Sequence, residues 1–285
     1  MPLVLNPAFT GGSGGYALYN NYRYQWPSLS SSYRTTLISA DIPIEKISSG
    51  FGLFFSDDRS GDLMIKNSYM LSYAYSYNLG ESVSIRAGLK GGISRSIINF
   101  DKLTFGDQID TRRGFIYETK QSIEPSVIYP DFGTGLLLSA KKFDIGLALD
   151  HINRPNQSHS KEGKSILPVL ASIHGSYSAR IENLNISPYL IIKKQQHFHH
   201  LILGTYIKSK RFFYGLAYYN AAGSANGANV SGGVNLKFVR VGYSYDVIKL
   251  WKPIGSHEIM LSFLLNDKKE RQKLRIVHNP LFSSF

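Results

Sequence analysis

The chain has 285 residues, a net charge of +12 and no cysteine, which excludes a disulfide framework and a thiolate metal site. Hydrophobic residues make up 43% of the sequence, so a disordered chain is excluded. The mean hydropathy of -0.15 and the lack of any run of about 18 apolar residues also exclude a bundle of membrane-spanning helices.

The basic excess by itself is compatible with nucleic acid, anionic lipid head groups or an acidic protein partner. The charged residues are spread along the whole chain, and no recognition-helix pattern or RNA-binding signature is present. We therefore expect no nucleic acid partner.

Residues 1–15 form a separate N-terminal segment. Met1–Leu5 lacks the basic stretch and the cleavage site of a secretory signal, so for an exported protein we expect a leader that was removed or lies outside this sequence. A glycine-rich loop cradles phosphate where it follows a strand and opens a helix, and Gly11–Gly15 has neither neighbour. We therefore expect a flexible turn into the first strand.

Strand-like alternation begins at residue 16. Because a strand sends successive side chains to opposite faces, the segment 16–26 places Tyr22 on one face and Arg23 on the other. In the next segment, 36–44, isoleucines share one face and Asp41 lies on the other. A third segment continues the pattern with Phe51, Leu53 and Phe55.

The segment 67–79 has the clearest alternation. One face carries large groups, namely Tyr69, Leu71, Tyr73, Tyr75 and Tyr77. The other face carries small groups and no charge, namely Ser68, Met70, Ser72, Ala74 and Ser76. An apolar medium on the tyrosine side and a crowded or wet lumen on the serine side would explain both faces, and this is the wall of a membrane barrel.

Charged residues are predicted to line the lumen of this barrel. In the segment 81–98 the apolar face is opposite Arg86 and Lys90, and such charges are costly in a dry core but natural in a hydrated interior. Applied to the whole chain, the same reasoning predicts lumen-lining positions at Arg23, Asp41, Arg86, Lys90 and Lys193.

The stretch 101–132 breaks the alternation and is long, mixed in charge and rich in apolar groups. Loops of this length are usually functional, and we expect a structured outer loop or a plug. Exposed aromatic and arginine side chains dominate protein interfaces. The predicted partner-binding residues are Phe105, Arg112, Arg113, Phe115, Tyr117 and Tyr129.

Hairpins resume after this loop, and the count reaches about fourteen strands, an even number as in single-chain bacterial barrels. The predicted fold is therefore all-β, a transmembrane antiparallel β-barrel over residues 16–266. We expect the short connections at one end and the long ones at the other, with both termini on the periplasmic side. Residues 267–285 would form a periplasmic tail.

Two clusters contain residue types that can bind a metal ion. The acidic turn predicted at 56–62 lacks the bidentate Glu of a calcium loop. The imidazoles His197, His199 and His200 have no carboxylate or thiolate near them in the sequence. We therefore expect turns at both places, and neither a metal nor a cofactor.

Six short motifs occur in order along the chain. They are Asn6-Pro7-Ala8 with Gly11, Arg23-Tyr24-Gln25-Trp26, Pro130-Asp131-Phe132-Gly133 with Gly135, His151-Ile152-Asn153-Arg154-Pro155, Gly242-Tyr243-Ser244-Tyr245-Asp246 and Ser256-His257-Glu258-Ile259. Together they resemble the PorP/SprF family of outer-membrane proteins of Bacteroidota, from about Asn6 to Leu265.

The resemblance implies a place in the type IX secretion system and, in some members, in gliding motility. It implies a secreted surface protein with a C-terminal secretion domain as the partner, with periplasmic components of the same machinery as further contacts. The family offers no active site to transfer.

Three functions remain to be weighed. The first is a barrel that binds or anchors a secreted surface protein, such as a gliding adhesin, through its outer loops or lumen. The second is an outer-membrane channel or transporter for small or hydrophobic solutes. The third is an enzyme, but no spacing of Ser, His and Asp selects a catalytic set, so we expect none.

Overall fold

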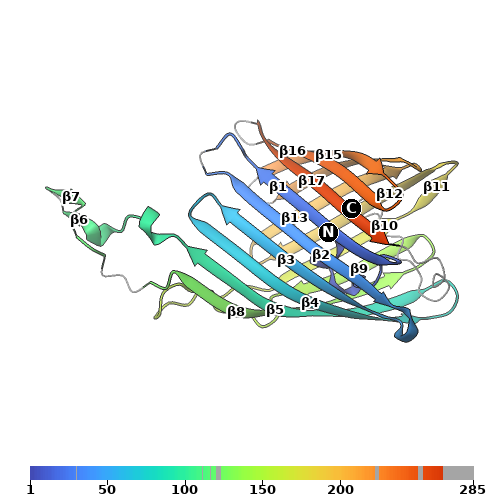
Figure 1. The fold of residues 1–285 in the computed structure, drawn as a ribbon, viewed down its shortest axis with the longest axis horizontal. Helices are drawn as coiled ribbons and strands as arrows, with labels where there is room; N and C mark the ends of the chain where they lie inside the picture. Colours follow the sequence, from blue (N-terminus) through green and yellow to red (C-terminus); the bar gives the residue numbers. More distant parts are fainter. Residues whose placement is uncertain are drawn as a thin grey trace.

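The strands close into a barrel of 14 antiparallel wall strands, as the alternation predicts (Figure 1). The computed structural model describes residues 1–29, 31–110, 112–115, 117–119, 123–221, 225–249 and 253–265. The tail predicted at 267–285 lies outside the described residues.

The wall strands follow one another around the barrel nearly in chain order. They are β1 (Tyr16–Gln25), β2 (Tyr33–Ile44), β3 (Ser49–Ser60), β4 (Met64–Asn78), β5 (Ser84–Ile98), β8 (Ser126–Ser139), β9 (Phe143–Asp150), β10 (Leu170–Tyr177), β11 (Ala179–Ile181), β12 (Leu184–Gln195), β13 (Phe198–Lys208), β14 (Phe212–Ala221), β15 (Ala225–Asn235), β16 (Val239–Lys249) and β17 (Pro253–Leu265).

Two pairings complete the wall. Strand β1 pairs with β17 from Tyr16 opposite Leu265 to Gln25 opposite Ser256, which closes the barrel. Strands β10 and β11 both pair with β12, so they act as one wall strand interrupted at Ser178. Closure leaves no unpaired edge, which is the condition for crossing a bilayer with strands.

Strand β4 shows why this sequence forms such a wall. Its large residues point outward, with Leu71 63% and Tyr77 59% exposed, whereas Ser72 and Ser76 point inward and are each 7% exposed. The outer surface of the barrel therefore presents Tyr and Leu, and the interior receives small side chains that leave room for other groups.

The two ends of the barrel differ. The long connections 99–125 and 151–169 leave the same end, which we call the loop end. The first and last wall residues, Tyr16 and Leu265, lie at the opposite end. The prediction that all short connections share one end is wrong, because the tight turns 61–63 and 196–197 lie at the loop end.

Two predicted boundaries also move. Strand β3 continues to Ser60, so most of the predicted acidic turn belongs to the wall, and the turn itself is 61–63. Strand β8 begins at Ser126, so residues 126–132 of the predicted loop are wall residues. In both cases cross-strand pairing extends a strand into a segment that lacks clear alternation.

The N-terminal segment enters the lumen instead of forming the predicted flexible turn. It contains α1 (Pro2–Leu5) and the 3-10 turn η1 (Pro7–Phe9). Asn6, Phe9 and Thr10 are all 0% exposed. None of the helices within the described ranges has the length and apolarity to span a bilayer.

Candidate functional site

Glycines on the inner wall receive the N-terminal segment. A Cβ atom on Gly88 of β5 would lie 2.3 Å from the Ala8 nitrogen, and one on Gly135 of β8 would lie 1.9 Å from the Asn6 Oδ1. A side chain at either position would occupy the space of the segment, so only glycine permits this approach. The segment therefore lies directly against the wall.

Asn6 is the main polar anchor of the segment. Its side-chain amide donates to the carbonyl oxygens of Leu136 in β8 and Leu147 in β9, both at 3.0 Å, and lies 3.0 Å from the His174 Nε2 in β10. Its Oδ1 accepts from the Ala8 nitrogen at 2.8 Å. One side chain thus ties the segment to three neighbouring strands.

Two of the predicted lumen residues hold the end of the same segment. Arg86 is 1% exposed and donates from Nη2 to the Thr10 carbonyl oxygen. Asp41 is 0% exposed and accepts from the Gly11 and Ser13 nitrogens. Because a buried charge is costly without hydrogen bonds, these contacts make the segment part of what keeps both charges in the interior.

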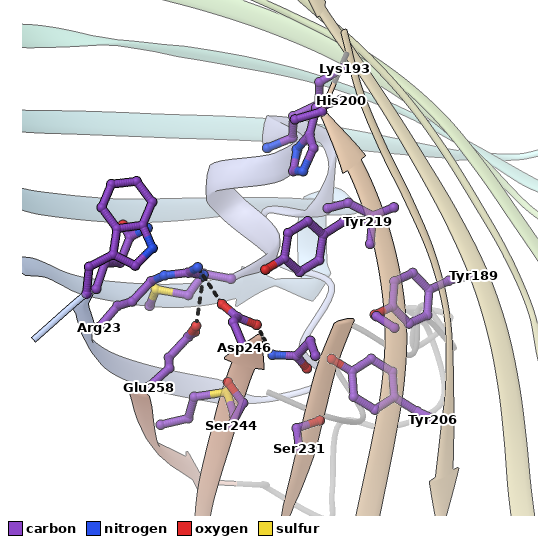
Figure 2. A pocket seen from close by; sticks show the side chains of 18 residues that line it. Arg23, Tyr189, Lys193, His200, Tyr206, Tyr219, Ser231, Ser244, Asp246 and Glu258 are labelled. Carbon is purple, nitrogen blue, oxygen red and sulfur yellow. Dashed lines mark hydrogen bonds and ion pairs between the residues drawn. The ribbon is translucent and has the colours of Figure 1, made fainter. Parts of the chain in front are cut away.

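The other predicted lumen residues lie in two further places. The Lys90 ammonium in β5 contacts the Asp150 carboxylate in β9 at 2.7 Å. Arg23 and Lys193 both line a cavity of about 580 Å³ beside the part of the lumen that the N-terminal segment fills (Figure 2). The segment contacts β3, β4, β5, β8, β9 and β10 and packs against Ile191 of β12. The cavity is bounded by β1, by β12 to β17 and by Met1 of the segment itself.

An ion-pair network organises one wall of this cavity. Arg23 of β1 donates to the Asp246 carboxylate of β16 and, at 3.3 Å, to the Glu258 carboxylate of β17 (Figure 2). Asn229 donates to the second Asp246 oxygen, and Asn21 donates to the second Glu258 oxygen. Every oxygen of the two carboxylates therefore already has a donor.

Tyrosines and glycines on adjacent strands shape the opposite wall of the cavity. In three places an inward tyrosine faces a glycine directly across the strand pair, and a Cβ on that glycine would lie 2.3–2.5 Å from the tyrosine or its ring. The rings can therefore lie flat against the wall and leave the cavity open. The pairs are Tyr189 with Gly204, Tyr206 with Gly215, and Tyr219 with Gly227.

The long connection 99–125 projects beyond the loop end and carries the small hairpin of β6 (Ile109–Asp110) and β7 (Gly114–Phe115) (Figure 1). Asp110 Oδ1 accepts from the Arg112 and Arg113 nitrogens at 2.9 and 2.8 Å. These backbone hydrogen bonds lower the pKa of the Asp110 carboxyl. A carboxylate thus fixes the turn that presents both arginines.

The base of this connection is attached to its surroundings. The Lys102 ammonium donates to the Asp62 carboxylate in the β3–β4 turn at 3.0 Å, and this contact lowers the pKa of Asp62. His159, from the connection 151–169, lies 2.9 Å from the Ser96 Oγ and 2.7 Å from the Glu124 carbonyl oxygen. The two long connections are therefore joined where they leave the barrel.

The predicted partner-binding residues do not all lie on one surface. Arg112 and Arg113 are exposed in the loop, Tyr117 is 55% exposed, and Phe105 lies at the start of the 3-10 turn η4 (Gly106–Gln108). The Phe115 side chain lies outside the described part of the structure. Tyr129, in contrast, lies in β8 and is 3% exposed, because strand pairing turns it into the barrel.

The acidic residues and the histidines that were candidates for metal binding have other contacts in the structure. In β3, Asp57 accepts from Arg59 and Asn67, and Asp58 accepts from Thr35. His200 lines the cavity, whereas His197 is exposed in a turn. Within the described ranges, no three His, Cys, Asp or Glu side chains gather in a metal-binding arrangement.

Sequence reasoning missed Asn6 and the glycines that receive the N-terminal segment. Asn6 was noticed only as part of a motif, because a single polar residue before a proline is typical of a turn. The available signal was the recurrence of glycine at inward positions of several strands, where an ordinary wall would carry serine or alanine. These glycines contact one segment only because the register between strands brings them together, and this register cannot be predicted from the sequence.

The sequence matches the family of type IX secretion system membrane proteins PorP/SprF over residues 1–263. The chain belongs to this family. The resemblance inferred from six motifs is thereby confirmed. No curated protein sequence matches the chain.

Solved structures share the fold of this PorP/SprF family member. The toluene transporter TbuX of Ralstonia pickettii has a TM-score of 0.58 at 11% identity, covering 92% of this chain and 93% of TbuX. The toluene transporter TodX of Pseudomonas putida gives 0.55 at 10%, covering 92% and 93%. The outer membrane protein Omp33 of Acinetobacter baumannii gives 0.53 at 6%, covering 89% and 100%.

The family and the fold together make this protein an outer-membrane β-barrel of the type IX secretion system. Neither corresponds to a known enzyme class. At these identities the likeness to the transporters shows the fold alone, because one fold serves many functions.

Proposed function

We propose that this barrel binds a secreted surface protein at the outer membrane through the connection 99–125. The observation that carries the proposal is the position of that connection, which projects beyond the barrel with its hairpin away from the wall (Figure 1). A segment that only sealed the lumen would lie over the opening. The partner is a protein with a C-terminal secretion domain, as membership of the family implies.

The chemistry of the loop supports this role. Arg112, Arg113 and Tyr117 are exposed on one short hairpin, and arginine and tyrosine are the residue types that contribute most at protein interfaces. Asp110 fixes the turn before any partner arrives, which reduces the entropy lost on binding.

We also infer the orientation of the barrel in the outer membrane. The loop end faces the cell exterior, where a surface protein is held. The opposite end, which carries Tyr16, Leu265 and the tight turns 182–183 and 209–211, faces the periplasm. Components of the secretion machinery in the periplasm would contact the protein there.

The first test removes the loop and leaves its base intact. Residues 103–121 are replaced by a short Gly-Ser linker, which preserves the Lys102 contact with Asp62 and the pairing of Ser126 in β8. We expect the barrel to reach the outer membrane at its normal level and to lose the co-purifying secreted protein, identified by mass spectrometry after gentle detergent extraction.

A matched pair of variants locates the contact. Alanine at both Arg112 and Arg113 removes two positive charges at the loop end, and alanine at both Lys210 and Arg211 removes two at the opposite end. We expect the first pair to weaken binding about thirtyfold, since two interface residues that each contribute about 1 kcal/mol together contribute about 2 kcal/mol, and the second pair to leave co-purification unchanged. Equal recovery with every variant would contradict the loop as the binding element.

A channel is the second candidate, and the cavity of about 580 Å³ favours it. The transporters with the same fold carry toluene, which is a small apolar solute. Planar-bilayer recording of the intact protein distinguishes the two functions. Large steady currents would favour a channel, whereas the lack of current expected for a lumen occupied by the N-terminal segment would favour the anchor.

A further inference from the structure

The cavity of about 580 Å³ has the size and lining of a ligand site. Pockets for small organic molecules are usually about 300–1,000 Å³, mostly apolar, with a few polar groups that fix orientation. This one lies in the half of the lumen nearest the loop end, since Trp26, His200 and Ala221 at the strand ends all line it. A solute that enters from the loop end would therefore reach it directly.

Among the described residues, four buried polar groups that line the cavity lack a hydrogen-bond partner, and each is an N–H donor or a hydroxyl. Within the described part of the chain, the Arg23 Nε, the Trp26 Nε1, the Tyr219 hydroxyl and the Ser231 Oγ are buried and make no hydrogen bond. Ser231 is only 6% exposed. Buried polar groups in proteins are nearly always hydrogen-bonded, so this set calls for a molecule that brings acceptors.

The lining carboxylates cannot supply those acceptors. All four oxygens of Asp246 and Glu258 already accept from Arg23, Asn229 or Asn21. Lys193 also lines the cavity and forms no ion pair with the residues that the structure describes. It lies beside His200, its direct partner across β12 and β13 (Figure 2). An anionic acceptor thus has a cation to meet.

The cavity also has an aromatic and apolar surface. The rings of Tyr189 and Tyr206 are stacked, with centroids 5.2 Å apart and an interplanar angle of 14°. Ile202, Ala217 and Met260 line the same cavity. Such a wall suits a planar or apolar body, because aromatic groups gain from offset stacking as well as from burial.

We propose that this cavity binds an organic carboxylate with an aromatic or apolar body, with the carboxylate at Lys193 and the body against Tyr189 and Tyr206. Two sources offer this chemistry, a free small acid and the carboxyl terminus of a polypeptide that enters the lumen. The inference is independent of the loop contact proposed above, since none of the residues involved belongs to the connection 99–125.

Isothermal titration calorimetry of the full-length protein in a non-ionic detergent tests the site. The probes are 4-phenylbutyrate and its neutral amide, and a glycine-serine hexapeptide that ends in phenylalanine with a free or amidated terminus. We expect at least one acid to bind at least about tenfold more tightly than its amide, because charge-assisted hydrogen bonds are the strong ones. Binding of 4-phenylbutyrate would indicate a free small acid as the ligand, and binding of the peptide acid would indicate a polypeptide carboxyl terminus.

Neighbouring lysines on β12 give a matched control. Lys193 faces the cavity, and Lys194 is exposed on the other face of the same strand. We expect Lys193→Gln to weaken acid binding about tenfold and to leave amide binding unchanged, and Lys194→Gln to change neither. Binding of neither acid, or equal binding by both variants, would overturn the proposal.

A second pair of variants tests the aromatic wall without removing a charge. A Cβ at Gly204 would lie 2.5 Å from the Tyr189 ring, so Gly204→Ala should push that ring into the cavity. At Gly232 the nearest atoms to a Cβ are 3.6 Å away, so Gly232→Ala is the control. We expect only the first to weaken acid binding. Unchanged binding by Gly204→Ala would exclude the stacked tyrosines as the contact surface.

Discussion

At the scale of single residues, Asn6 shows how much one side chain can organise. Its amide bridges Leu136 and Leu147 on adjacent strands while its oxygen holds the Ala8 nitrogen in the next turn. Aspartate would lose both donated bonds, and leucine would also lose the accepted one. The position requires a donor and an acceptor on one planar group.

We expect Asn6→Ala to loosen the N-terminal segment. Truncation leaves a buried backbone nitrogen without its acceptor, which costs about 1–3 kcal/mol. Hydrogen exchange at Ala8, Phe9 and Thr10 should accelerate, while exchange in β4 should not. Asn153→Ala is the control, since Asn153 also donates to a backbone carbonyl, at Pro130, but at the exposed loop end. Equal acceleration by both variants would argue against a specific anchor.

At the scale of elements, the N-terminal segment and the connection 99–125 take opposite positions. The segment is built of small and apolar residues and lies against glycines inside the wall. The connection is charged and lies outside it, held at its base by Asp62 and Lys102. The sequence was compatible with a plug formed by the long loop, but the short segment occupies the lumen.

Removal of residues 2–13 should open the lumen. The wall is closed by β1 and β17 without this segment, so we expect the barrel to insert in membranes. Planar-bilayer conductance should rise above that of the intact protein. Replacement of 103–121 by a linker is the control and should leave conductance unchanged. If the truncated and intact proteins conduct equally, the segment does not control the opening.

The turn at Asp110 should depend on pH. Hydrogen bonds from the Arg112 and Arg113 nitrogens lower the folded-state pKa of Asp110 below its unfolded value. The carboxylate therefore stabilises the turn above the unfolded pKa, and this stabilisation is lost as the pH falls through the lowered pKa. We expect the two amide proton shifts to titrate together with a midpoint below about 3.9, the ordinary value for Asp. A midpoint at or above that of a denatured sample would exclude these bonds.

For the barrel as a whole, the lipid outside and the polar interior determine which residues each face of the wall carries. Lipid outside requires Tyr, Leu and Phe on the outer face, and paired backbone around the full circumference. Inside, ion pairs hold some charges, as in Lys90 with Asp150 and Arg23 with Asp246 and Glu258, and backbone groups hold Arg86 and Asp41. The outer face therefore repeats a few residue types along every strand, whereas each inner contact joins a specific pair of residues.

An arginine on the outer face should be costly in proportion to its depth. Leu71 lies near the middle of β4 and is 63% exposed on the outer face, whereas Tyr77 lies near the end of the same strand. We expect Leu71→Arg to lower the free energy of unfolding from lipid vesicles by about 2–4 kcal/mol and Tyr77→Arg to lower it by about 0–1 kcal/mol. Urea titration in vesicles measures both. Equal effects would place the bilayer elsewhere on the barrel.

The amino-acid sequence is sufficient to predict the wall. Alternation in β4 and β5 depends only on neighbouring residues and on which solvent each face meets, so it can be read without coordinates. The number of strands and the inward positions of Asp41 and Arg86 follow from the same two-residue period. The motifs were sufficient for the family, because they lie in order along one chain.

The contents of the interior, in contrast, follow from contacts that form only in the folded barrel. Asn6 meets carbonyl groups 130 and 141 residues away, and the glycines that admit its segment come from separate strands. The same holds for the cavity, where Arg23 meets Asp246 and Glu258 only after β1 closes on β17. Such contacts depend on the register of distant strands, which local periodicity does not encode.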